Sequence, residues 1–110
     1  MHLEEPTADE MTLAGVMAAL SDPMRVAIVR DLASRGESTC GTFELGISKA
    51  TRSHHFKVLR EAGLTHTRAE GTHRFVSLRR DVVDSRFPGL LEAVLAAAEA
   101  EAGDQRGVAV

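Results

Sequence analysis

Apolar residues recur every three to four positions in several stretches of the chain, and this spacing predicts amphipathic helices. The first stretch covers residues 9–20, and its apolar positions are Leu13, Val16, Met17 and Leu20. Thr7 or Asp9 can act as its N-cap, because a hydroxyl or carboxylate accepts an unpaired N–H of the first turn. The pattern predicts one surface helix at the start of the chain.

Further helices are indicated by residues that typically begin or end them. Asp22 suits an N-cap and Pro23 the first helical position, so a second helix is expected from residue 23 to about residue 35, before Gly36. A shorter element is expected over residues 39–45, with Thr39 as its cap. A last helix is predicted over residues 90–102, and its apolar stripe is formed by Leu91, Val94, Leu95 and Ala98.

The helix predicted between Ser48 and Gly63 differs from the others, because only a narrow stripe of it is apolar. Ser48 can cap its start, and Gly63 can close its end in a left-handed conformation. Phe56, Leu59 and Gly63 form the stripe, with Arg52 and His55 beside it. Hydrogen-bond donors occupy the rest of the surface: Lys49, Thr51, Ser53, His54, Lys57 and Arg60. Such donors meet phosphates and base edges, so this helix is expected to enter a groove of DNA.

After Gly63 the period changes from 3.6 to 2. Alternation over residues 64–69 and 73–78, with a turn at 70–72, predicts a β-hairpin. Near its tip stand Arg68, Thr72, His73 and Arg74, which are expected to reach the DNA backbone or minor groove. His66 and His73 could pair across the hairpin, which would make it sensitive to pH, or both could be solvated.

Together these elements predict a fold that is mainly α-helical with a β-hairpin wing. Two helices around Gly46, over 39–45 and 48–62, are typical of a helix-turn-helix, whose second helix reads DNA. The expected order is four helices, two strands and a last helix: a winged helix-turn-helix. Residues 9–102 are expected to form one domain, with 1–8 and 103–110 as flexible tails and 80–85 as a connector.

Composition supports one small globular domain. The chain has 110 residues, 44% of them hydrophobic, which is enough for a modest core. Its single cysteine, Cys40, excludes an internal disulfide and fits a reducing compartment. No apolar run could span a membrane and no signal peptide is recognisable, so the cytoplasm is expected. Neither a phosphate-binding glycine loop nor a catalytic constellation is present, so we do not expect an enzyme.

The net charge of −3 conceals a strong asymmetry. Residues 49–80 carry a net charge of +6, and the remainder carries −9. A basic face on an acidic body suits phosphate binding and makes double-stranded DNA the expected partner. The alternative is that this face meets an acidic protein partner, in which case binding would not depend on DNA sequence.

Two segments resemble the ArsR/SmtB family of bacterial winged-helix repressors. Residues 19–32 (ALSDPMRVAIVRDL) are similar to the family's helix-2 signature, and residues 53–64 (SHHFKVLREAGL) to its recognition helix. The turn at 70–72 then falls where the family has its wing. The resemblance implies a homodimeric repressor on a palindromic operator, with the first and last helices at the dimer interface. The implied interface residues are Leu13, Val16, Met17, Leu20, Leu91, Val94, Leu95 and Ala98.

The chain departs from this family at the positions that sense metals. Cys40 stands alone where relatives have a Cys-x-Cys pair, and the last helix contains no histidine. Carboxylates alone make a poor zinc or soft-metal site, so no metal or other cofactor is expected. Cys40 stays open as a redox sensor or a buried apolar residue, and a small-molecule inducer stays open too. Arg52, at a position more often apolar in the family, could extend toward phosphate or could loosen the core.

Overall fold

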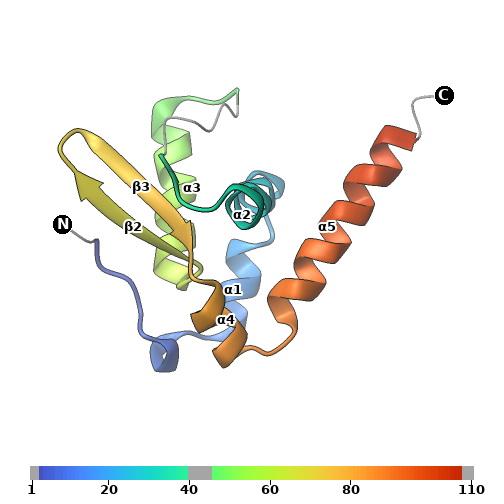
Figure 1. The fold of residues 1–110 in the computed structure, drawn as a ribbon, viewed down its shortest axis with the longest axis horizontal. Helices are drawn as coiled ribbons and strands as arrows, with labels where there is room; N and C mark the ends of the chain where they lie inside the picture. Colours follow the sequence, from blue (N-terminus) through green and yellow to red (C-terminus); the bar gives the residue numbers. More distant parts are fainter. Residues whose placement is uncertain (1–2, 40–45, 108–110) are drawn as a thin grey trace.

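The computed structural model describes residues 3–39 and 46–107. Its elements are η1 (Ala8–Glu10), α1 (Leu13–Ala19), α2 (Pro23–Arg35), β1 (Ser38–Thr39), α3 (Lys49–Ala62), β2 (Thr65–Glu70), β3 (His73–Leu78), α4 (Arg80–Arg86) and α5 (Leu90–Gly107). The β2-β3 hairpin and α5 lie at opposite ends of the molecule, with α1, α2 and α3 between them (Figure 1). One end of the molecule is thus formed by the β2-β3 hairpin, and the other by the projecting helix α5.

The residues expected to bound α2 and α3 do so. The carboxylate of Asp22 accepts from the N–H of Met24 at 2.8 Å and that of Arg25 at 3.4 Å, and Pro23 opens α2. The hydroxyl of Ser48 accepts from the N–H of Thr51 at 3.1 Å at the start of α3. These caps fix the residues at which α2 and α3 begin.

The three strands form one antiparallel sheet in the order β1-β3-β2. Thr67 of β2 lies opposite Val76 of β3, and Val76 lies opposite Ser38 of β1. Thr65, Thr67 and Val76 are buried, so this face of the sheet, here called the inner face, packs on the core. Because side chains alternate along a strand, Arg68 and Phe75 lie on the other, outer face.

The core is almost entirely aliphatic, as the absence of Trp and Tyr requires. Its buried members are Met11, Val16, Ala19, Ile28, Val29, Leu32, Phe56, Leu59, Leu64, Val76, Val83 and Leu91. The helices α1 to α5 and the sheet therefore share one core. The helix α3 contributes Phe56 and Leu59, the apolar stripe predicted from its sequence.

Several expectations about the start of the chain are wrong. The first helix begins only after Thr12, whose hydroxyl accepts from the N–H of Gly15 at 3.0 Å, while Thr7 caps the short η1 instead. Residues 3–8 do not form a free tail. The N–H of Leu3 donates to the C=O of Thr67 at 3.0 Å, so the N-terminal segment covers the outer edge of β2.

Other boundaries differ as well. Thr39 pairs with Phe75 as part of β1, and the rest of the short element expected over 39–45 lies outside the described residues. The expected connector at 80–85 is the helix α4, with Val83 buried in the core. The last helix runs on through Gly103 to Gly107, past the predicted end at residue 102, and its alanine-rich turns have a high helix propensity. Across the part of the chain that is described, every helix is too short or too polar to span a bilayer.

A buried hydroxyl gives a stability prediction. The Oγ1 of Thr65 is buried and has no hydrogen-bond partner among the described residues. Because Thr65→Val keeps the shape and removes this unpaired group, it should raise the free energy of unfolding by about 1 kcal/mol in urea denaturation. Thr12→Val is the control of opposite sign, since it removes a helix cap and should cost about 1 kcal/mol. A lower urea midpoint for Thr65→Val would contradict this reading.

Candidate nucleic-acid interface

A groove runs between α3 and the inner face of the hairpin, with a volume of about 610 Å³. The side chains that α3 contributes follow each other at helical spacing: Lys49, Arg52, Ser53, Phe56 and Arg60. The sheet and its turn contribute Thr39, Thr67, Thr72 and Arg74. The structure thus brings together six of the residues predicted to bind DNA, from two segments of the chain.

The remaining predicted donors of α3 lie outside this lining. His54 and Lys57 are exposed on the outward side of the helix. Thr51 is also exposed, and its hydroxyl lies 3.0 Å from the hydroxyl of Ser48. The helix α3 therefore presents donors along two edges, one facing the hairpin and one facing away from it.

The two predicted arginines of the hairpin lie on opposite faces of the sheet. Arg74 pairs with Ala69 on the inner face and lines the groove. Arg68 lies on the outer face, with its guanidinium 4.5 Å above the ring of Phe75. The turn itself is Gly71-Thr72, one residue shorter than expected, and this places Arg68 and Arg74 out of phase.

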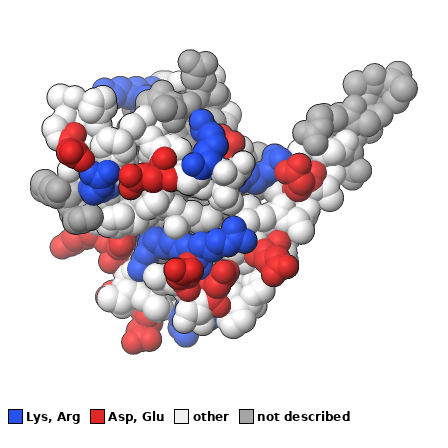
Figure 2. Space-filling view, viewed as in Figure 1, with Lys and Arg blue, Asp and Glu red and all other residues white. Residues whose placement is uncertain are grey.

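Arg68 is held by two carboxylates. It forms an ion pair with Glu70 and another with Glu37 at 3.1 Å. The hydrogen bonds from Glu70 and then Glu37 raise the pKa of Arg68 above its ordinary value. On the face shown in Figure 2, cations over the hairpin lie among acidic side chains. The contact of Arg68 with DNA phosphate stays a prediction, and its guanidinium lies between two carboxylates of the same chain.

The histidines of the hairpin do not pair with each other. His66 lies opposite Ser77, and its Nδ1 is 3.0 Å from both carboxylate oxygens of Glu5. His73 is exposed on the outer face near the ring of Phe75, so it stands apart from the groove. The possible His66–His73 pair is wrong, because the hairpin register separates them.

Two arginines that sequence reasoning missed hold the interface in place. Arg25 donates to the C=O of Ala19 at 2.6 Å and lies 3.2 Å from Nδ1 of the buried His55, which ties α3 to α1 and α2. Arg79 donates to the C=O of Gly63 at 3.1 Å and lies 3.6 Å from the carboxylate of Glu5. No local pattern marks either residue, because both act on partners distant in sequence.

The carboxylate of Asp22, the N-cap of α2, lies beside Arg25 and stabilises the start of the same helix. Burial acts to raise the pKa of Asp22, but the N–H groups of Met24 and Arg25 and the nearby charges of His55 and Arg25 outweigh it. The pKa of this carboxyl is consequently held below its ordinary value, so the cap stays ionised at neutral pH.

The residues expected at a dimer interface divide into three groups. Val16 and Leu91 are 0% and 1% exposed, so they belong to the core of one chain and are corrected as interface residues. Leu13 and Met17 are 49% and 56% exposed on α1. Half-buried positions make up the third group: Leu20, Val94, Leu95 and Ala98.

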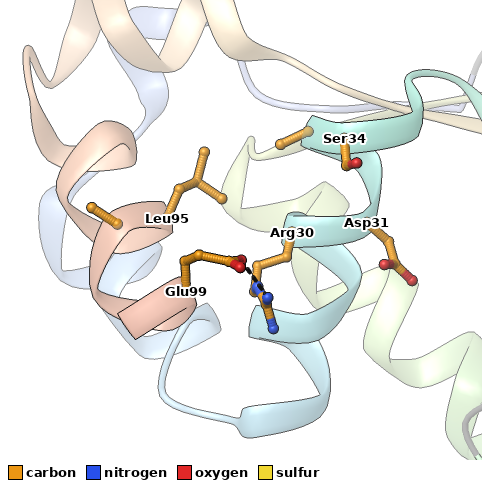
Figure 3. A pocket seen from close by; sticks show the side chains of 7 residues that line it. Arg30, Asp31, Ser34, Leu95 and Glu99 are labelled. Atoms are coloured by element: carbon orange, nitrogen blue, oxygen red, sulfur yellow. Dashed lines mark hydrogen bonds and ion pairs between the residues drawn. The ribbon is translucent and has the colours of Figure 1, made fainter. Parts of the chain in front are cut away.

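The half-buried group lines two hollows between α2 and α5. One, of about 540 Å³, includes Leu20, Val94 and Ala98 in its lining. The other, of about 510 Å³, includes Leu95 and is crossed by an ion pair of 2.5 Å between Arg30 and Glu99 (Figure 3). An apolar strip of α5 and the exposed side chains of α1 therefore remain available for contact with another molecule.

A metal-binding group is not found in the described ranges, where no cluster of three or more His, Cys, Asp or Glu residues could hold an ion. Cys40, the candidate sensor, lies outside these ranges.

A helix that packs across a small sheet and leads directly into a hairpin, with exposed donors on both, defines the class of winged helix-turn-helix proteins. A model described as a helix-turn-helix domain matches residues 20–68. The chain is 46% identical over 88 residues to the uncharacterized HTH-type transcriptional regulator YceK of Bacillus subtilis, covering 77% of this chain and 88% of that protein.

Solved structures agree with this class. A possible transcriptional regulatory protein from Mycobacterium bovis has a TM-score of 0.62 and 27% identity, covering 79% of this chain and 90% of the other. An ArsR family transcriptional regulator has a TM-score of 0.57 and 22% identity, covering 89% and 93%. The chain belongs to the HTH-type transcriptional regulators and has the winged fold of the ArsR family, which confirms the resemblance found in its sequence.

Proposed function

We propose that the chain represses transcription as a homodimer that binds a palindromic operator sequence-specifically and is released by an unidentified signal. One observation carries the proposal: donors from α3 and from the inner face of the hairpin line one groove at one end of the molecule. A helix with such donors fits the major groove of DNA, and a hairpin beside it reaches the adjacent backbone.

Position along α3 suggests two kinds of contact. Ser53 and His54 stand near the start of the helix, where recognition helices contact base edges. Lys57 and Arg60 stand further along the helix, and such cations neutralise phosphates without reading sequence. The proposal thus assigns specificity to the first turns of α3, and affinity to cations along it and to Arg74.

Apolar surfaces outside the groove support self-association. Leu13 and Met17 are exposed apolar side chains one helical turn apart on α1, and α5 carries a strip of half-buried apolar residues. In a symmetric pair the same surface meets itself, and two copies of α3 then address two half-sites of opposite orientation. A palindromic operator follows from this symmetry.

The test is fluorescence anisotropy of the purified protein on its own upstream DNA and on a scrambled duplex, over a salt series. We expect a preference of about 10³-fold or more for the upstream duplex and a steep loss of affinity with salt. Equal and weak binding to all upstream and scrambled duplexes would contradict a sequence-specific repressor and favour an acidic protein partner.

Variants of α3 separate the two kinds of contact. Lys57→Ala should weaken binding to both duplexes by the same factor and lower the salt slope by about one. Ser53→Ala should weaken binding only to the upstream duplex, by about tenfold, because a lost base contact affects specificity. Arg80→Ala is the control, since this exposed arginine on α4 lies 3.9 Å from Asp84 and should change neither. An unchanged salt slope in Lys57→Ala would refute its assignment to phosphate.

A further inference from the structure

The distal half of the β2-β3 hairpin projects beyond the core. The buried side chains of the hairpin, Thr65, Thr67 and Val76, all lie in the half next to the helices, here called the base. In the described stretch 68–75, which includes the turn and Arg74, no side chain is buried. Because a strand rises about 3.3 Å per residue, a tilt of about 10° at Thr67 would move the turn by about 3 Å. The position of Arg74 therefore depends on what holds the base.

The N-terminal segment is attached to this base through its backbone. The N–H of Leu3 donates to the C=O of Thr67 at 3.0 Å, along the edge of β2 that does not pair with β3. Figure 1 shows the segment beside the hairpin before it continues to η1. At the other end Met11 is buried, and its C=O accepts from Nε and Nη2 of Arg86 at 3.3 and 3.2 Å. One end of residues 3–11 is thus fixed to the hairpin and the other to the core.

Glu5 joins the middle of this segment to the base of the hairpin. Both of its carboxylate oxygens lie 3.0 Å from Nδ1 of His66 on β2, and one of them lies 3.6 Å from Nε of Arg79. The side chains of Glu5, His66 and Arg79 are only 21%, 27% and 12% exposed. Salt therefore screens this contact less than it screens a fully exposed ion pair.

Arg79 extends the contact to the end of α3. One nitrogen of its guanidinium, Nη1, donates to the C=O of Pro6 at 2.8 Å and to the C=O of Gly63 at 3.1 Å. Gly63 lies between α3 and β2, so this nitrogen joins the N-terminal segment to the point where the hairpin leaves the helix. Loss of the Glu5 carboxylate would remove one partner from Arg79 and one from His66.

We propose that residues 3–11 are a strap that holds the hairpin at the angle required for contact with DNA, and that Glu5 is its positioning residue. Glu5 is not among the described residues that line the groove. It acts through His66 and Arg79 on the base of the hairpin, and thereby on the position of Arg74. The effect on DNA binding rests on the proposed function, whereas the effect on the hairpin itself does not.

Anisotropy with the upstream duplex tests the strap through the sign of the effect. Loss of a carboxylate makes the chain less acidic, so charge alone predicts slightly tighter binding to DNA. We expect Glu5→Ala to weaken binding about tenfold instead, because the hairpin is no longer held in place. Glu4→Ala removes the same charge from an exposed position one residue earlier, and this matched control should not weaken binding. Glu5→Gln keeps the side-chain length and one acceptor oxygen, so its affinity should lie between those of wild type and Glu5→Ala.

A double-mutant cycle shows whether Glu5 acts through the hairpin. In an Arg74→Ala background, Glu5→Ala should weaken binding by less than about threefold, because the contact that the strap positions is already lost. A full tenfold effect in that background would place its cause outside the hairpin and overturn the proposal.

Amide hydrogen exchange on the DNA-free protein tests the hairpin directly. In Glu5→Ala, residues 68–75 should exchange about five times faster than in Glu4→Ala, while α2 exchanges at the same rate in both variants. Equal rates in 68–75, or an equal acceleration in α2, would overturn the strap. If the protein binds no DNA duplex at all, the proposed function fails and exchange alone decides: faster exchange confined to the hairpin supports the strap, and its absence overturns it.

Discussion

Gly63→Ala is expected to lower the free energy of unfolding by about 3 kcal/mol, from two separate causes. Gly63 has a φ of +92° at the end of α3, where a side chain adds strain of about 1–2 kcal/mol. A Cβ there would lie 2.6 Å from Cγ and 2.7 Å from Sδ of the buried Met11. Relieving that overlap costs about 1–3 kcal/mol more, and urea denaturation measures the sum.

Gly71→Ala is the matched control for this prediction. Gly71 also has a positive φ, of +61°, but a Cβ there would meet nothing within 4 Å. Its replacement should therefore cost only the conformational strain, about 1 kcal/mol. If both variants lose the same stability, contact with Met11 does not contribute and the prediction is wrong.

The cost at Gly63 bears on the interface, because this residue joins α3 to β2. The N–H of Leu64 donates to the C=O of Leu59 at 3.0 Å, and the N–H of Arg79 donates to the C=O of Leu64 at 2.9 Å. The angle between the recognition helix and the hairpin is fixed at this junction, and so is the width of the groove between them. A shift of the backbone at Gly63 would therefore also move Arg74 relative to Arg52.

Much of this fold follows from patterns within a few residues. Asp22, Ser48 and Gly63 bound their helices as predicted, because capping depends on side chains and N–H groups three residues apart. The alternation that predicts the hairpin is equally local. The recognition helix and its exposed donors could therefore be located without a structure.

Features that depend on distant partners could not be predicted. In the sequence, Arg68 and Arg74 are equal candidates for contact with DNA. The two-residue turn places them on opposite faces of the sheet. Its partner Glu37 comes from before β1, and no sequence pattern joins the two. In the same way, Val16 shares the apolar stripe of Leu13 and Met17, but the position of the core decides that it faces inward.

The exposed apolar side chains of α1, Leu13 and Met17, give a prediction about self-association. Met17→Glu is expected to raise the dissociation constant of the proposed dimer about 100-fold or more, because a charge would be buried against an apolar partner. Since Met17 is 56% exposed in the single chain, the fold should tolerate the change. Sedimentation equilibrium measures the association, and Thr72→Glu, which adds the same charge in the hairpin turn, is the control.

The consequence for DNA binding follows from the symmetry of the pair. Two linked copies of α3 bind two half-sites with an effective concentration that a single chain lacks, so Met17→Glu should weaken binding to the upstream duplex although Met17 lies outside the groove. Binding to a single half-site should be unchanged, which separates lost association from a damaged recognition helix. An unchanged dissociation constant in Met17→Glu would place the interface elsewhere and remove α1 from it.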